Sequence, residues 1–188
     1  MCIMLDLETA GTANNAAVFS VSAVIFSLST GEVFNEFEQF AEIQGQVDKG
    51  AVIDVGTFLW WLAQGEDARR MIIKGQEKAS PAREVVAQFN YWLECALSKE
   101  ELENVQMWGN GATADNVWLR NMFNREGMEC VVPFWADADM RTLVKFTGCE
   151  KIKKEMPFEG VKHNGLDDCK HQVKICHAAW VKVYGGIA

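Results

Sequence analysis

The stretch Cys2-Ile3-Met4-Leu5-Asp6-Leu7-Glu8-Thr9, close to the start of the chain, decides the class of fold. Its first four residues form a short apolar run, which is typical of a strand buried inside a sheet that helices cover. Asp6 and Glu8 follow this run at positions i and i+2. Because side chains alternate along a strand, we expect both carboxylates on one face, about 6 to 7 Å apart at the backbone.

Two carboxylates on one buried strand repel each other unless a cation lies between them. The pair Asp6 and Glu8 therefore indicates a site for a divalent metal ion, since such ions prefer clustered oxygen ligands. The alternative interpretation is a surface strand with two solvated acids, and an Asp-x-Glu pattern alone does not exclude it. The apolar run before Asp6 favours the metal site, because solvated strands usually alternate.

A second acidic segment surrounds Asp115. The run Val105-Gln106-Met107-Trp108 predicts another buried strand, and Gly109-Asn110-Gly111 predicts a chain reversal after it. Asp115 then opens a predicted helix. Active sites of open α/β sheets lie just beyond the carboxyl ends of strands, which is where this carboxylate falls. The alternatives are that Asp115 is only a helix N-cap and Asn110 only a turn residue.

The third segment, His163-Asn164-Gly165-Leu166-Asp167-Asp168, combines an imidazole with two acids. A helix is predicted after His163, with Asp168 in its early turns, so the two side chains can face one cavity. An imidazole with an ordinary pKa of about 6.5 can accept a proton from water near neutral pH. Asp167 competes with Asp168 as a metal ligand. An exposed loop histidine beside an acid at a helix N-terminus is the alternative interpretation.

In this order the three segments resemble the motifs of the DEDDh 3′–5′ exonucleases, the superfamily of ribonuclease T and the polymerase proofreading subunits. Asp6 and Glu8 match the first motif, Asp115 the second, and His163 with Asp168 the third, whose His-x4-Asp register selects Asp168 over its neighbour. The resemblance covers nearly the whole chain. It is greatest to small phage and prophage exonucleases and to the bacterial 3′–5′ exoribonuclease-like group.

Three further stretches support this resemblance: Trp60-Trp61-x-x-Gln64, Trp108-Gly109-Asn110-Gly111-Ala112 and Asp139-Met140-Arg141-Thr142-Leu143. The chain departs from the pattern at Ala114, where relatives often carry Phe. It also departs in the loop Ala13-Asn14-Asn15-Ala16, whose small residues leave substrate contacts there open.

The resemblance implies a ribonuclease H-like α/β fold, with a central mixed sheet of five or six strands flanked by helices. Residues 17–28 and 32–41 predict an antiparallel hairpin that extends the sheet of the first strand. Ser80-Pro81 predicts a helix start, followed by apolar residues at helical spacing. No internal repeat or linker interrupts the sequence, so we expect residues 1–188 to form a single 3′–5′ exonuclease domain.

The resemblance also implies a metal-dependent 3′–5′ exonuclease that releases nucleoside 5′-monophosphates from single-stranded nucleic acid, with DNA favoured over RNA. Asp6, Glu8 and Asp168 would hold one Mg²⁺ or Mn²⁺, Asp6 would bridge to a second, and Asp115 would serve that second ion. His163 would be the general base. The alternatives are an exoribonuclease that trims RNA 3′ ends and, from a different class, a nucleic-acid-binding module without turnover.

Three residues are candidates for substrate contacts: Thr9, Asn110 and Trp61. Thr9 lies where relatives contact the terminal nucleotide. Trp60 and Trp61 are adjacent on a predicted helix and cannot both point straight inward. Burial is the favoured interpretation, and the alternative is that one of them lines the substrate groove or a dimer contact. Further tryptophans on predicted apolar helix faces are expected in the core: Trp92, Trp118 and Trp180.

The formal net charge of −8 opposes a nucleic-acid enzyme, because most such proteins carry a basic surface. The charge is unevenly distributed: residues 141–188 hold nine Lys/Arg against five Asp/Glu, a net of +4, which leaves −12 for residues 1–140. The lysines that precede His163 are expected where phosphates approach, or alternatively form a solvated loop: Lys145, Lys151, Lys153, Lys154 and Lys162.

Composition predicts the cellular setting. The chain has 188 residues, 49% of them hydrophobic, which is enough to bury a substantial core. No run reaches transmembrane length, and the first strand begins so early that we expect no signal peptide and no membrane. Six cysteines without CxxC spacing predict free thiols in the reducing cytoplasm. The sequence does not determine the oligomeric state, although many relatives of the superfamily pair as homodimers.

Overall fold

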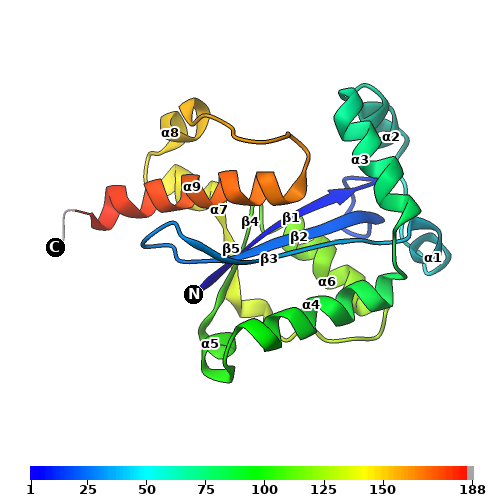
Figure 1. The fold of residues 1–188 in the computed structure, drawn as a ribbon, viewed down its shortest axis with the longest axis horizontal. Coiled ribbons are helices and arrows are strands. Elements are labelled where there is room, and N and C mark those ends of the chain that lie inside the picture. Colours follow the sequence, from blue (N-terminus) through cyan, green and yellow to red (C-terminus); the bar gives the residue numbers. More distant parts are fainter. Residues whose placement is uncertain (186–188) are drawn as a thin grey trace.

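One five-stranded mixed sheet organises the protein in a computed structural model, which describes residues 1–185. The strands lie in the order β3-β2-β1-β4-β5 (Figure 1). β2 pairs antiparallel with β1 and with β3, whereas β4 runs parallel to β1 and to β5. The strand bounds are β1 Cys2–Thr9, β2 Val18–Phe26, β3 Val33–Phe40, β4 Gln106–Gly109 and β5 Asp137–Asp139. This confirms the predicted ribonuclease H-like fold and its central mixed sheet.

Helices cover both faces of the sheet, with α4 and α6 on one side and α7 and α9 on the other (Figure 1). Each side has its own apolar core, one packed against α4 and α6 and one against α7 and α9. The helix bounds are α1 Ile43–Asp48, α2 Val55–Leu62, α3 Glu66–Glu77, α4 Ala82–Ala96, α5 Lys99–Asn104, α6 Asp115–Arg125, α7 Met140–Phe146, α8 Glu150–Glu155 and α9 Gly165–Tyr184, with a 3₁₀ turn at Phe134–Ala136.

The central strand β1 connects the two cores. Ile3 and Leu5 are fully buried in the core on the α4 and α6 side, whereas Met4 is fully buried in the core on the α7 and α9 side. Because side chains alternate, Asp6 and Glu8 share the Met4 face of the strand. The alternation therefore directs both acids toward the helix that carries Asp168.

The hairpin and the helix start predicted from the sequence are both confirmed. β2 and β3 pair antiparallel beside β1, within the predicted limits of 17–28 and 32–41. α4 begins at Ala82, directly after Pro81, because a proline fixes a backbone angle that suits the first turn of a helix and lacks the N–H that a helix interior would need.

The prediction for the tryptophans was partly wrong. Trp92, Trp118 and Trp180 are half-buried rather than fully buried, although Trp92 and Trp118 pack against the core on the α4 and α6 side. The indole N–H explains two of these positions: Trp92 Nε1 donates to Asn35 Oδ1 at 3.0 Å, and Trp118 Nε1 donates to Ala13 O at 2.8 Å. Both acceptors lie near the surface, so the polar edge of each ring stays there while its apolar body packs inward.

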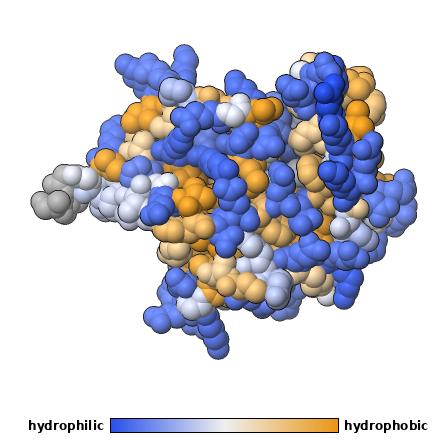
Figure 2. Space-filling view, viewed as in Figure 1, coloured by the Kyte–Doolittle hydropathy of each residue, from blue (hydrophilic) through white to orange (hydrophobic). Residues whose placement is uncertain are grey.

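The surface mixes polar and apolar side chains (Figure 2). Four apolar side chains of α2 are more than half exposed: Val55, Phe58, Leu59 and Leu62. Within residues 1–185, no helix has the length and apolar character that crossing a membrane requires. All six cysteines are free thiols.

Candidate active site

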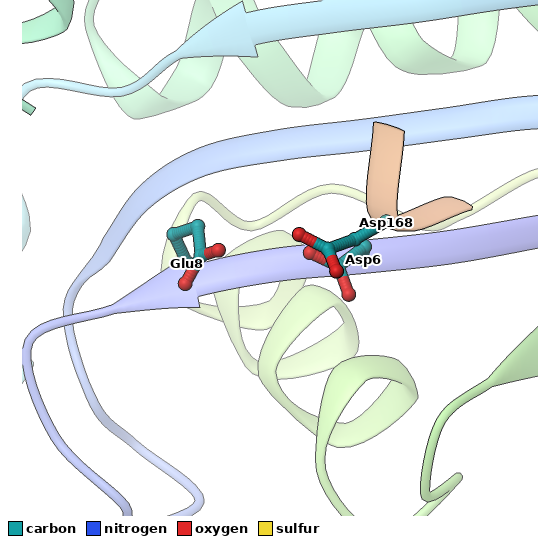
Figure 3. A group of neighbouring side chains, drawn as sticks. All are labelled: Asp6, Glu8 and Asp168. Atoms are coloured by element: carbon teal, nitrogen blue, oxygen red, sulfur yellow. The ribbon is translucent and has the colours of Figure 1, made fainter. Parts of the chain in front are cut away.

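Three carboxylates converge at the carboxyl end of β1: Asp6 and Glu8 from the strand and Asp168 from α9 (Figure 3). One oxygen of each lies within 4.8 Å of the others. Hard divalent cations such as Mg²⁺ and Mn²⁺ take clustered carboxylate oxygens as ligands, so this donor set fits such an ion.

A glycine allows α9 to approach the sheet closely. At Gly165, the first residue of α9, a Cβ atom would come within 2.3 Å of the Ser22 side-chain oxygen, so no other residue fits without displacing β2. One turn later the Cys169 thiol lies 3.6 Å from the carbonyl oxygens of Met4 and Ser22. This close packing brings Asp168 over β1.

Burial and mutual repulsion raise the pKa values of the clustered acids. Burial first, and then the charges of Glu8, Asp115 and Asp168, raise the pKa of Asp6 well above its ordinary value. Burial, followed by the charges of Asp168 and Asp115, raises the pKa of Glu8 to about 8. The acids therefore cannot all ionise near neutral pH without a counter-charge, which a divalent cation would supply.

Asp115 lies beside this cluster as the first residue of α6 and is buried. Its Oδ1 accepts a hydrogen bond from the Leu7 peptide N–H at 3.2 Å, which fixes it between β1 and the end of β4. Burial raises its pKa to about 6, although hydrogen bonds from the Leu7 and Asn110 peptides and the charge of Arg141 oppose this rise. The alternative that Asp115 is an N-cap is wrong, because Ala114 is the N-cap residue.

His163 precedes α9 with a left-handed backbone angle of φ = 66°. Its peptide N–H donates to Asp168 Oδ2 at 2.8 Å, and its imidazole Nδ1 lies 3.9 Å from Glu8 Oε1. The ring packs edge-on against two indoles, with centroid distances of 5.2 Å to Trp60 and 5.8 Å to Trp61. A third of the side chain, 34%, is exposed, so water can reach the ring.

Asp167, the alternative metal ligand, does not join the cluster. Its Oδ2 accepts the peptide N–H of Val161 at 2.8 Å, and its own N–H donates to the side chain of Asn164, the N-cap of α9. Asp167 therefore holds the loop that carries His163, and Asp168 is the residue that faces β1.

The substrate candidates Thr9 and Trp61 line a cavity of about 450 Å³ next to Glu8. Trp61 is only 6% exposed, and its Nε1 donates to the Thr9 carbonyl at 2.9 Å, so it is mainly a core residue. Its neighbour Trp60 is 46% exposed and also lines the cavity. Of the tryptophan pair, Trp60 is therefore the one whose face is open to a ligand.

Asn110, the third substrate candidate, lies on the β4 side of the acids. Its side-chain Oδ1 accepts a hydrogen bond from Lys153 Nζ at 3.2 Å, and its peptide N–H binds the carboxylate of Asp115. Asn110 is thus more than a turn residue, because it links a basic side chain to an acid of the site.

Gln172 is a site residue that the sequence interpretation missed. It is 4% exposed, and its Nε2 donates to Asp6 Oδ1 at 2.7 Å. This hydrogen bond lowers the pKa of Asp6, against the larger effects of burial and neighbouring charge. The spacing of Gln172 could have identified it from the sequence, because it lies four residues after Asp168 and therefore on the same face of α9.

Comparison with solved structures shows a shared fold. The chain matches the nuclease domain of 3′hExo, a DEDDh family member, bound to rAMP, with a TM-score of 0.65 and 15% identity over 98% of this chain and 92% of that one. It matches E. coli exonuclease I in complex with a dT13 oligonucleotide with a TM-score of 0.58 and 14% identity over 97% of this chain. The chain spans about two fifths of the length of the exonuclease I chains, 40% in that complex.

Comparison of sequences shows the family. No curated protein matches the chain. The model of the Rv2179c-like 3′–5′ exoribonuclease domain matches residues 1–180, which is nearly the whole sequence. The chain belongs to the Rv2179c-like 3′–5′ exoribonuclease domain family.

Proposed function

We propose that this chain is a metal-dependent 3′–5′ exonuclease that releases nucleoside 5′-monophosphates from single-stranded nucleic acid. The observation that carries the proposal is the convergence of Asp6, Glu8 and Asp168 with His163 beside a cavity of about 450 Å³. Membership of an exoribonuclease domain family supports it. A binding module without turnover would gain nothing from crowding buried acids, whose repulsion destabilises the fold.

Asp6, Glu8 and Asp168 would hold one Mg²⁺ or Mn²⁺, with Asp6 bridging to a second ion that Asp115 serves directly or through water. When bound, the ions would supply Lewis-acid stabilisation of the attacking and leaving oxygens. Gln172 keeps one Asp6 oxygen oriented through its 2.7 Å hydrogen bond. Leu7 does the same for Asp115 through its peptide N–H.

His163 would be the general base. Its Nδ1 faces Glu8, so Nε2 would accept the proton of the attacking water. The water oxygen forms a bond to phosphorus as the bond from phosphorus to the 3′-oxygen of the preceding nucleotide breaks. That 3′-oxygen takes a proton from solvent. The products are a nucleoside 5′-monophosphate and a strand that is one nucleotide shorter with a free 3′-hydroxyl.

The terminal nucleoside would occupy the cavity beside Glu8. Thr9 and Trp61 form part of its wall, and the exposed face of Trp60 is available for stacking on a base. Asn110 would contact the strand on the opposite side of the acids, next to Lys153.

DNA is the favoured substrate in this proposal, and trimming of RNA 3′ ends is the second candidate. The preference for DNA rests on the resemblance to phage and prophage exonucleases, and both the resemblance and the preference stay predictions. The description of the matching family as exoribonucleases favours RNA. A single domain that spans residues 1–188 and a cytoplasmic location are likewise predictions. Light scattering would measure whether the protein forms a homodimer.

The experiment that tests this function uses DNA and RNA strands of one sequence, labelled at the 5′ end, with Mg²⁺, Mn²⁺ or EDTA. Shortening from the 3′ end in the presence of metal, and none in EDTA, is the expected result. The faster of the two reactions identifies the substrate. A mobility shift on a native gel without any cleavage would contradict the proposal and favour the binding module.

A further inference from the structure

Two basic side chains, Arg141 on α7 and Lys153 on α8, lie beside the acidic centre next to the end of β4. Lys153 Nζ donates to Asn110 Oδ1 at 3.2 Å, and Asn110 in turn binds Asp115 through its peptide N–H. The Arg141 guanidinium lies over Gly111, where a Cβ atom would come within 3.4 Å of its central carbon. The two cations therefore share the loop that connects β4 to α6.

Neither cation forms an ion pair within residues 1–185, although other lysines near α9 do. Lys170 pairs with Glu36 at 3.0 Å, for example. The acid at the start of α7, Asp139, directs its two oxygens to the peptide N–H groups of Ala112 and Thr142, at 2.7 and 2.6 Å. Arg141 and Lys153 thus keep hydrogen-bond donors free beside a nuclease-like centre.

The two cations also repel each other. Burial and then the charge of Arg141 lower the pKa of Lys153, which is half-buried. Against burial, the charge of Arg141 helps to lower the pKa of Asp139 and opposes the rise in the pKa of Asp115, but neither acid forms an ion pair with it, so a bound anion would relieve the repulsion between the two cations. This local positive charge contrasts with the net charge of −8 of the whole chain.

The sheet order sets the direction of a bound strand. The cavity lined by Trp60 lies at the end of β1, whereas Arg141 and Lys153 lie beyond the ends of β4 and β5. β1, β4 and β5 are parallel and adjacent, so their carboxyl ends lie at the same end of the sheet. A strand with its terminal nucleoside in the cavity and its scissile phosphodiester at the acids would extend toward the two cations.

We propose that Arg141 and Lys153 form an anion subsite for the backbone phosphate next upstream of the scissile phosphodiester. The guanidinium offers a planar pair of donors to two phosphate oxygens, and the ammonium offers a point charge whose remaining N–H groups are free. The ligand class is the phosphodiester backbone of a single-stranded polynucleotide. This inference rests on the proposed nuclease function and names residues that bind its substrate away from the chemistry.

The test measures binding of oligothymidylate and oligouridylate, labelled with fluorescein at the 5′ end, by fluorescence anisotropy in EDTA over a range of salt concentrations. Arg141→Gln and Lys153→Gln should each weaken binding about 5-fold and reduce the slope of log K against log salt by about 0.7, the value for one phosphate contact on a single strand. Arg141→Lys should keep the slope. The matched control is Lys154→Gln, which removes an exposed charge from the same helix.

Wild-type affinity and slope in both glutamine variants would overturn the subsite, as would an equal effect of Lys154→Gln. A second arm uses the p-nitrophenyl ester of thymidine 5′-monophosphate, which has only the scissile phosphodiester. Its hydrolysis should lose much less in both variants than oligonucleotide cleavage does. Equal losses on the ester and on oligonucleotides would also overturn the subsite, because the two residues would then act at the reaction centre or on the fold.

The two proposals fail separately. A wild-type protein that hydrolyses neither the ester nor an oligonucleotide in metal would contradict the nuclease function. The anisotropy comparison in EDTA requires no turnover, so it would still decide whether Arg141 and Lys153 bind phosphate. Unchanged thermal unfolding of the variants excludes misfolding as the cause of weaker binding.

Discussion

The imidazole of His163 lies edge-on against the indole of Trp60, with the ring centroids 5.2 Å apart and the planes at 85°. Trp61 packs on the same imidazole at 5.8 Å and is itself anchored to β1 by its hydrogen bond to the Thr9 carbonyl. The left-handed backbone of His163 cannot hold the ring by itself, since χ rotation remains free. The two indoles therefore restrict the orientation of the proposed base.

Replacing Trp60 by leucine should lower kcat about 10-fold, on the scale expected when a catalytic group is displaced by a fraction of an ångström. The physical reason is that leucine cannot reproduce the edge-to-face contact, so the imidazole samples other orientations. The effect on kcat should disappear in a His163→Ala background, because the imidazole that Trp60 orients is then missing, whereas an effect on KM from stacking on the nucleobase should remain. Single-turnover rates of the four proteins measure this.

Trp135→Leu is the control for that cycle, because Trp135 is 74% exposed and lies in the 3₁₀ turn before β5, away from His163. A Trp60→Leu effect on kcat that persists in full without His163 would show that Trp60 does not act through the imidazole.

Asp6→Asn should remove nearly all activity and at the same time stabilise the protein in EDTA. The amide keeps an oxygen that can accept the Gln172 hydrogen bond, and it removes a buried charge that Glu8, Asp115 and Asp168 oppose. Removal of a group that serves developing charge costs about 100-fold or more in rate. Thermal unfolding in EDTA and nucleotide release in Mg²⁺ measure the two effects. A lower melting temperature for the variant would contradict the electrostatic account.

In EDTA, stability should fall as pH rises from about 5 to about 8. The pKa values of Asp6, Glu8 and Asp115 are raised in the folded state, to about 8 for Glu8 and about 6 for Asp115. A raised carboxyl pKa contributes stability below the unfolded value of about 4, and that contribution is lost as pH passes through the folded value.

Divalent metal should reverse this trend, because a bound cation favours the ionised acids. The gain in melting temperature from Mg²⁺ should therefore be larger at pH 8 than at pH 5.5, as measured by differential scanning calorimetry. Asp6→Asn should flatten the pH dependence in EDTA. A wild-type melting temperature that rises with pH in EDTA would contradict the assignment of repelling buried acids.

Gln172→Ala should lower kcat about 10- to 100-fold, which is typical when the hydrogen-bond partner of a metal ligand is removed. The Asp6 carboxylate would lose its 2.7 Å hydrogen bond and with it a fixed orientation. Gln106→Ala is the control, since Gln106 is exposed at the start of β4. The metal concentration for half-maximal activity should rise in Gln172→Ala only, and unchanged kinetics in this variant would show that Gln172 does not position Asp6.

The sequence predicted the sheet and its flanking helices because their signals are local. The apolar run before Asp6 and the proline at the start of α4 each reflect interactions within a few residues. The spacing from His163 to Asp168 predicted a shared site for a similar reason, since His163 lies two residues before α9 and Asp168 lies in the first turn of that helix. The structure brings these residues together with Asp6 and Glu8.

Contacts between distant segments could not be predicted in this way. Trp60 meets His163 only because α2 folds back over the end of β1, and no sequence pattern records that approach. The exposure of the two neighbouring tryptophans likewise depends on which indole reaches the Thr9 carbonyl. Lys153 donates a hydrogen bond to Asn110, which lies 43 residues earlier in the sequence, and the packing of α8 determines this contact.

The most direct test of the central claim compares linear and circular forms of one single-stranded substrate, each with Mg²⁺ and with EDTA. The wild-type protein should degrade the linear form from its 3′ end to nucleoside 5′-monophosphates in Mg²⁺ and leave the circle intact, because a circle has no 3′ end. Asp168→Asn should degrade neither form. Cleavage of the circle, or degradation of the linear strand in EDTA, would contradict a metal-dependent 3′–5′ exonuclease.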